Sequence, residues 1–228
     1  MDLCMDLCMK VLFFTLLVFL SACDKKPRDT KNLPWKTSIT ESGATQVLGI
    51  DIGDVNLTDL SIRLRDVPDI ALFESDKGKL NLEAYFGKVN VGLLEARIVA
   101  DLEASDAFLK QVKSQARKRE ATPNNNWKYK LTEDDNTKAF KMKVWRLVYM
   151  PTGQYEEKQI KFFGEPEETI KVTDTAEYRL FPSKGYIILW DTDGGEIFYY
   201  VAKKDFARLK ASLPMKLMAT PKKSAEKD

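Results

Sequence analysis

Histidine is absent from all 228 residues, and this absence removes several kinds of active site. Neither a Ser-His-Asp triad nor a Cys-His pair can form, and no imidazole is present to bind zinc, copper or iron. Enzymes that use only carboxylate, lysine or tyrosine side chains remain open. The missing histidine favours a binding or structural protein over an enzyme, and we predict neither a cofactor nor a metal ion.

Cysteine is scarce, and a long apolar run is missing. The three cysteines all lie within the first 23 residues, at Cys4, Cys8 and Cys23. Residues 11–20 (VLFFTLLVFL) are apolar except for Thr15, but ten helical residues cover only about 15 Å of a bilayer core of roughly 30 Å. A run of this length after the positive charge of Lys10 is typical of a signal peptide, which we predict at residues 1–22.

The run ends in Leu20-Ser21-Ala22-Cys23, which resembles the lipobox of bacterial lipoproteins. The resemblance implies that Cys23 is acylated on its sulfur and on its new amino group and becomes the first residue of the mature chain. Several acyl chains give stable membrane attachment. The alternative is a small buried cysteine beside a secretory cleavage site. Because Cys4 and Cys8 are removed with the signal peptide, an acylated Cys23 leaves no thiol for a disulfide.

Two residues near this signal bear on the translation start and on the localisation. The tetrapeptide Met-Asp-Leu-Cys occurs twice at the start, which puts negative charge where signal peptides are positive, so Met9 is an alternative start. Asp24 follows Cys23 directly, and lipoproteins of enteric-type bacteria with aspartate there resemble those retained in the inner membrane. We therefore expect a lipid anchor facing the periplasm from the inner membrane, with the outer membrane as the alternative.

The mature chain, residues 23–228, is large enough for one substantial domain or two small ones. Its basic surplus is only +3 once residues 1–22 are removed, which does not favour nucleic acid as a partner. We expect a tether at 23–34, sub-units at 35–120 and 127–213 separated by the loop 121–126 (ATPNNN), and a flexible tail at 214–228.

Hydrophobic periodicity predicts an α+β fold of antiparallel sheet with a few short helices. Alternating apolar residues over 79–86 predict a half-buried strand, in a hairpin whose turn is Asp76-Lys77-Gly78. A helix is expected at 57–64, capped by Asn56 or Thr58, and another after Ser105. Further strands are expected at 35–39, 46–52, 70–75, 92–101, 140–149, 177–181, 186–191 and 196–201, and further short helices at 155–163 and 205–212.

The two sub-units share an outline of short helix, proline stop and antiparallel strands, in which Pro68 is equivalent to Pro166. Chance similarity is the alternative to a duplication. The second unit, 155–201, also resembles the small lipoproteins of the outer-membrane assembly type (SmpA/OmlA, or BamE-like). The resemblance rests on Phe163-Gly164-Glu165-Pro166 and on residues 185–201, and it implies a helix leading into a three-stranded meander. The unit departs from that family in lacking a pair of N-terminal helices.

Three residue groups are candidate sites. Residues 190–196 (WDTDGGE) supply only the opening of a calcium loop, and an Asp-Gly turn explains them without a metal. Carboxylates for glycosidase-type chemistry are available, but the sequence fixes no separation between them; these are Glu165, Glu167, Glu168, Asp174 and Glu177. Aromatic residues of the last strands can line a sugar or peptide site, although sheet core is the commoner role; these are Tyr186, Trp190, Phe198, Tyr199 and Tyr200.

The leading interpretation is a non-catalytic envelope lipoprotein that is anchored through Cys23 and binds another envelope protein or a cell-wall component. The alternative is a carboxylate-based hydrolase acting on cell-wall glycan or peptide. An aromatic-lined cleft that encloses two acids favours the hydrolase, whereas a shallow apolar sheet face or an exposed strand edge favours the binder.

Overall fold

The computed structural model describes residues 32–91 and 94–214. The predicted signal peptide, Cys23, most of the tether and the tail beyond residue 214 lie outside the described residues. Within residues 32–91 and 94–214, no helix is long and apolar enough to cross a membrane.

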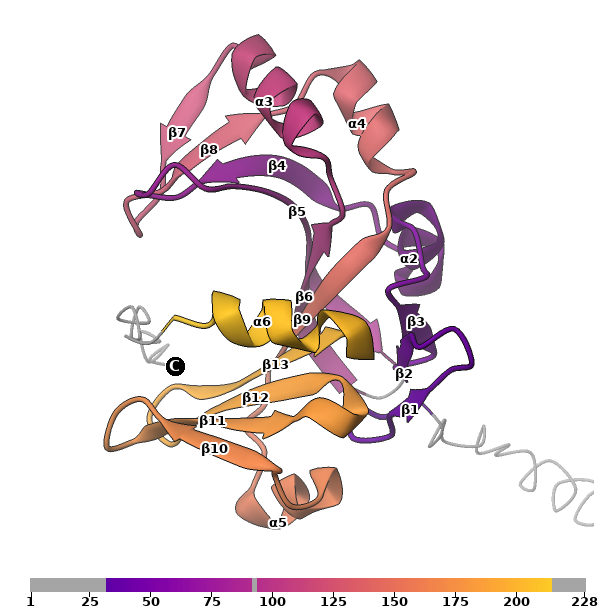
Figure 1. Ribbon diagram of the computed structural model, residues 1–228, viewed down its shortest axis with the longest axis vertical. Helices are drawn as coiled ribbons and strands as arrows, with labels where there is room; N and C mark the ends of the chain where they lie inside the picture. Colours follow the sequence, from indigo (N-terminus) through magenta and orange to yellow (C-terminus); the bar gives the residue numbers. More distant parts are fainter. Residues whose placement is uncertain (1–31, 92–93, 215–228) are drawn as a thin grey trace, which may run out of the picture.

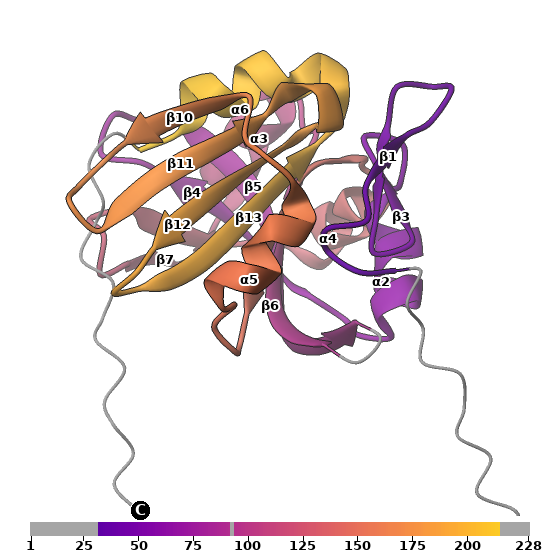
Figure 2. The ribbon, with the colours of Figure 1, turned by 90° about the horizontal axis from the view of Figure 1, so that it is seen from below.

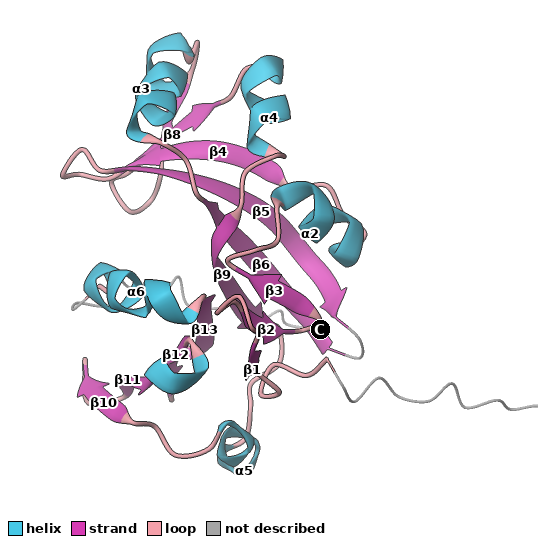
Figure 3. Ribbon diagram, turned by 45° about the vertical axis from the view of Figure 1, so that its right-hand side comes forward, coloured by secondary structure: helices cyan, strands magenta, loops and turns pink. Residues whose placement is uncertain are grey.

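One antiparallel sheet of ten strands runs through most of the fold and bends so strongly that it encloses a concave face (Figures 1 and 3). Across the sheet the strands are β10 (Glu168–Lys171), β11 (Ala176–Phe181), β12 (Tyr186–Asp191), β13 (Gly195–Val201), β9 (Val144–Pro151), β6 (Leu94–Leu102), β5 (Leu80–Val91), β4 (Asp69–Glu74), β8 (Trp127–Lys130) and β7 (Arg119–Ala121). The prediction of an α+β fold on antiparallel sheet is confirmed.

Short helices cover both sides of this sheet (Figures 1 and 3). The convex side carries α2 (Leu57–Leu64), α3 (Asp106–Gln115), α4 (Glu133–Ala139) and α5 (Glu157–Ile160), the last continued by the 3₁₀ turn η2 (Lys161–Phe163). The concave side holds α6 (Phe206–Ser212). A small sheet of β1 (Ser38–Ile39), β2 (Thr45–Val47) and β3 (Ile50–Ile52) lies beside α2 (Figure 2).

Two helix starts follow from their capping residues, as the sequence predicts. The Asn56 side chain accepts a hydrogen bond of 2.9 Å from the backbone N–H of Asp59 at the start of α2. Ser105 Oγ accepts one of 3.3 Å from Phe108 N at the start of α3. Each side chain satisfies one of the backbone donors that a helix N-terminus leaves free.

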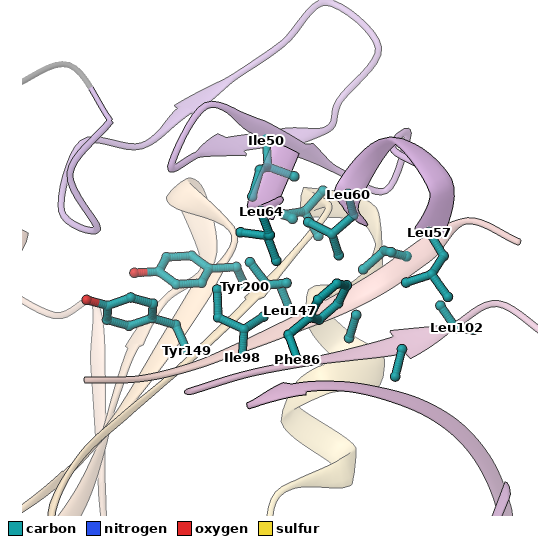
Figure 4. Close-up of a cluster of buried hydrophobic side chains, with 14 of the residues drawn as sticks. Ile50, Leu57, Leu60, Leu64, Phe86, Ile98, Leu102, Leu147, Tyr149 and Tyr200 are labelled. Carbon is teal, nitrogen blue, oxygen red and sulfur yellow. The ribbon is translucent and has the colours of Figure 1, made fainter. Parts of the chain in front are cut away.

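The sheet separates two hydrophobic cores. On the convex side, α2 and β3 pack onto the middle strands through buried residues such as Leu60, Phe86 and Leu147 (Figure 4). On the concave side, α6 packs through Phe206 and Leu209 onto strands β11 to β13. The predicted alternation in β5 is present, with Leu82, Ala84 and Phe86 in the convex core. Alternate residues of β5 therefore face the concave side.

Several predicted elements have different bounds. The strand expected at 46–52 is the hairpin β2–β3, because Leu48 and Gly49 both have positive φ (55° and 72°) and form a tight turn. Residues 119–130 hold a second unpredicted hairpin, β7–β8, and the cations at 117–119 lead from the end of α3 into it. The strand expected at 140–149 begins only at Val144, and β10 was not predicted.

Strands from both predicted sub-units belong to the same sheet. Strand β9 pairs with β6 on one side and β13 on the other, and β8 pairs with β4. The two ways of aligning the sub-units disagree. Placing Pro68 over Pro166 in the sequence makes β4 equivalent to β10, whereas counting strands outward from β9 in the sheet makes β4 equivalent to β11. The division into two related sub-units stays a prediction.

Candidate binding cleft

A cleft of about 650 Å³ opens at the end of the sheet where β5 begins and β6 ends, between α3 and α6. Its lining combines apolar and charged side chains, among them Phe73, Lys79, Glu83, Lys110, Trp145 and Arg208. We call this feature the cleft. Its mixed lining is typical of a site for a polar ligand with some apolar surface.

Three ionisable residues lie on one rung of the sheet at the cleft. Glu83 on β5 is the cross-strand partner of Asp101 on β6, and Asp101 is the partner of Arg146 on β9. Because Leu82 and Ala84 face the convex core, Glu83 between them faces the concave side. Two carboxyl groups therefore lie beside one guanidinium.

Asp101 is 0% exposed and is held by two side chains. Arg146 Nε donates a hydrogen bond to Asp101 Oδ2, and Asn81 Nδ2 donates one of 2.7 Å to Asp101 Oδ1. The same Asn81 nitrogen donates to Glu83 Oε1 at 3.0 Å, and Arg146 NH1 donates to Ser212 Oγ of α6 at 3.2 Å. The network thus joins three strands to α6.

The electrostatics of the network favour a protonated Glu83. Burial, and then the charge of Asp101, raise the pKa of Glu83 from 4.5 to about 7, against opposing contributions from Asn81 and Arg146. The pKa of Arg146 lies above its usual value. Burial acts to lower it, but the neighbouring Asp101 and Glu83 carboxyls raise it by more. Burial also raises the pKa of Tyr199 to about 12. Arg146 therefore stays charged, while Glu83 gains a proton near neutral pH.

Trp145 is an aromatic residue of the cleft lining that two guanidinium groups approach. The pairing of β6 with β9 shifts register between Asp101 and Leu102, and Trp145 is the extra residue on β9. Arg208 Cζ of α6 lies 3.7 Å from the indole centroid and Arg146 Cζ lies 5.0 Å from it. Such stacking is a favourable cation–π arrangement. Trp145 Nε1 is buried and has no hydrogen-bond partner in the described part of the chain.

The acidic residues of 190–196 do not converge. Asp191 Oδ1 accepts a hydrogen bond of 3.0 Å from Asp193 N within the turn. Glu196 is turned into the fold, where its Oε1 accepts one of 3.2 Å from Tyr155 N. Within residues 32–91 and 94–214, no three His, Cys, Asp or Glu residues are grouped as ligands for a metal ion.

The carboxylates considered for hydrolysis are engaged one by one at separate places. Glu167 Oε1 accepts hydrogen bonds from Ser183, and Glu168 pairs with Lys210 at 2.7 Å. Asp174 pairs with Lys171 at 2.9 Å and Glu177 with Arg179 at 2.6 Å. Glu165 has no such contact among those of the described residues. The acids that the fold does bring together, Glu83 and Asp101, were not among the sequence candidates.

The aromatic residues of the last strands divide between core and partly buried positions. Tyr186, Phe198 and Tyr200 are 0% exposed and belong to the convex core. Trp190 packs against that core and Tyr199 against the concave core, both only partly buried. Both faces of this part of the sheet are covered, so these residues do not form an open aromatic face.

The residues of the cleft carried one weak signal in the sequence. Arg146 is a single charge within the otherwise apolar stretch 144–149 (VWRLVY), and a charge inside a buried strand needs a partner. Its partner is 45 residues earlier in the chain, so the pair cannot be found from local pattern.

Comparison of the chain with protein-family models, curated proteins and solved structures finds no match to any of them.

Proposed function

We propose that this chain is a periplasm-facing lipoprotein, anchored through acylated Cys23, that binds another envelope protein or a cell-wall component in the cleft without catalysing a reaction. The lipobox-like Leu20-Ser21-Ala22-Cys23 and the short apolar run before it support the anchor. Asp24 favours the inner membrane, and the outer membrane remains the alternative. The BamE-like resemblance of residues 155–201 supports a role in envelope assembly or maintenance.

The burial of Asp101 carries the choice of binding over hydrolysis. Hydrolases of the two-carboxylate class need two carboxyl groups that reach the substrate. Asp101 is 0% exposed and bound by Arg146 and Asn81, so the acid that lies next to Glu83 on the sheet does not reach a substrate. Cations and aromatic surface around Glu83 suit recognition of a ligand.

The charge of the lining indicates what kind of ligand fits. Lys79, Lys110 and Arg208 line the cleft together with Glu83 and Asp106. Arg208 is paired with Glu103 at 2.6 Å, whereas Lys79 and Lys110 are exposed at the rim of the cleft. A ligand that bears carboxylates, as acidic protein segments and cell-wall peptides do, complements this rim.

A photocrosslinking amino acid at Phe73 in the cleft tests the binding site in intact cells, with Thr137 on the exposed side of α4 as the control position. We expect one reproducible adduct from position 73 and none from 137, and loss of the adduct in Lys79→Glu/Lys110→Glu. Equal capture at both positions contradicts the proposal. Release of fragments from cell-wall material by the purified protein, abolished in Glu83→Gln, replaces it with the hydrolase.

Labelling with radioactive palmitate tests the anchor separately. We expect incorporation into the chain and its loss in Cys23→Ser. Incorporation that survives Cys23→Ser rules out acylation at this residue.

A further inference from the structure

A second cavity, of about 710 Å³, lies where α2 ends. It is lined by Asn32, by residues 63–66 at the end of α2 and by residues 88–91 of β5. Arg63, Arg65 and Lys88 supply three cationic groups here, against the single carboxylate of Asp66. Lys88 is 3.6 Å from Glu95 in an exposed pair, and such pairs contribute little because solvent screens them. The region is therefore electropositive.

Two large apolar side chains stand exposed beside these cations. Ile62 is 70% exposed and Val67 is 78% exposed, more than any other large apolar side chain of the described residues. Leu57, Leu60 and Leu64 already turn the apolar face of α2 into the core, so Ile62 has no partner there. We call Ile62, Arg63, Arg65, Val67 and Lys88 the α2 surface. Cations beside projecting apolar groups are typical of proteins that lie on a membrane.

The length of the tether keeps the α2 surface close to the predicted anchor. Nine residues lead from Cys23 to Asn32, which lines the same cavity, and nine extended residues span at most about 30 Å. The first described residues, α2 and the β5–β6 end of the sheet lie at the same end of the molecule (Figure 2). A fold held this near a bilayer meets the headgroups with that end.

The tether adds charge of the same sign. It carries Lys25, Lys26, Arg28 and Lys31 against Asp24 and Asp29. Together with the three cations of the α2 surface, this number of basic groups is in the range that binds anionic lipid. Tethering also raises the effective concentration of the surface at the bilayer, so that weak contacts suffice to hold it there.

The basic residues 117–119 do not meet these conditions. Residues 117–119 follow α3 and lead into β7, at the end of the molecule away from β1 and the first described residues (Figures 1 and 2). Arg119 Cζ lies 4.2 Å from the ring centroid of Trp127, so this guanidinium is already occupied. This segment provides a control for charge reversal at a distant place.

We propose that the α2 surface lies on the bilayer that holds Cys23 and binds the headgroups of its anionic phospholipids, with Ile62 and Val67 at the depth of the headgroups. The inference rests on the proposed acylation of Cys23. It adds a second, reversible contact that fixes how the fold is oriented on the membrane.

The test uses the acylated protein reconstituted in nanodiscs of phosphatidylcholine with phosphatidylglycerol, and in nanodiscs of phosphatidylcholine alone. Residues 24–228 contain no cysteine, so Val67→Cys carries an environment-sensitive dye at one position, and Asn124→Cys in the β7–β8 turn is the control. We expect a blue shift of the dye at position 67 only, only with phosphatidylglycerol, and its loss in 0.5 M salt, where screening is strong.

Charge reversal identifies the residues. Arg63→Glu/Arg65→Glu/Lys88→Glu should abolish the shift, whereas Arg117→Glu/Lys118→Glu at the distant segment should leave it unchanged. If the triple variant does not fold, the loss of the blue shift in 0.5 M salt, measured with the unmodified α2 surface, tests the same electrostatic contact. An acylated protein whose dye responds equally in both nanodiscs overturns this inference and leaves the proposed function intact. Mass spectrometry that finds no acyl chain on Cys23 overturns both.

Discussion

Arg146 donates a hydrogen bond to the fully buried carboxylate of Asp101 across the junction of β9 and β6, with 45 residues of chain between them. The pair lies at the middle of the ten-stranded sheet. It joins the strands that connect the two ends of the sheet, and Arg146 NH1 also reaches Ser212 on α6. This pair therefore bears on both the stability of the fold and the chemistry of the cleft.

Arg146→Met should lower the free energy of unfolding by about 3–5 kcal/mol, because it leaves a buried carboxylate without its cation. Urea unfolding of the mature chain at pH 7 measures the change. Arg179→Met, which removes a partly exposed pair with Glu177, is the control and should cost less than about 1 kcal/mol. Replacing both members, in Asp101→Leu/Arg146→Met, should recover part of the loss; an equal cost for the two single variants contradicts the assignment.

Glu83 should make the fold less stable as the pH rises. Its pKa is about 7 in the folded protein, against 4.5 for a fully solvated glutamate, so the folded state binds more protons between these values. The stabilisation is complete below pH 4.5 and is lost as the pH rises through 7, with a size on the order of 3 kcal/mol. Groups with lowered pKa, such as Glu167 and Asp174, act in the opposite direction.

Glu83→Gln isolates this contribution because glutamine resembles the neutral acid. We expect the variant and the unchanged protein to have similar stability near pH 4.5, and the variant to become the more stable of the two above pH 7. The measurement is urea unfolding at closely spaced pH values. Glu95→Gln, at an exposed carboxylate, should give no such divergence. A constant difference across the range shows that Glu83 does not titrate in this window.

Gly185→Ala should be far more damaging than Gly78→Ala, although both glycines have φ near 75°. A Cβ at Gly185 would lie 2.1 Å from Thr45 Oγ1 and 2.6 Å from Val201 O, whereas nothing lies within 4 Å at Gly78. The second change should cost only the left-handed penalty of about 1–2 kcal/mol. Thermal unfolding compares them. Equal losses of stability in the two variants would mean that β2 of the small sheet does not pack against the turn that precedes β12.

Phe163→Ala should cost about 3–5 kcal/mol, as expected for a fully buried phenylalanine. Its ring is 0% exposed and stacks on Phe198 at 5.0 Å between centroids. The adjacent Phe162 is 62% exposed and stacks on Trp35 with the ring centroids 5.5 Å apart. Phe162→Ala should therefore cost about 1 kcal/mol. Urea unfolding measures both. If Phe162→Ala costs more than Phe163→Ala, the ring of Phe162 and not that of Phe163 lies in the core.

Local features of the sequence predicted local structure well. Asn56 and Ser105 identify the starts of α2 and α3 because a capping side chain acts within three residues. The hairpin around Gly78 follows from turn chemistry, and its strands form as expected. The end of the short helix before Gly164 is also explained by local sequence, because the φ of 85° at this residue is one that glycine adopts readily. In each case the signal and the structure lie within a few neighbouring residues.

The cleft was not predictable in the same way. Glu83 was expected on the solvated face of its strand, and it does face away from Leu82, but the presence of Asp101 and α6 on that face depends on pairings across the whole chain. The pairing of β6 with β9 spans more than 40 residues, and no local pattern sets it. The exposed edge strands β7 and β10 are short and polar, so hydrophobic periodicity does not reveal them.

The position of β9 also sets an order for folding. Strand β6 is complete at Leu102, but its second neighbour is not synthesised until Val144–Pro151. Until then the meander of β4, β5 and β6 has an open edge with Ala96, Ile98 and Ala100 along it, and such edges recruit other chains. Pairing across so long an interval is slow. A chain cut before residue 144 should therefore aggregate rather than fold as a smaller domain.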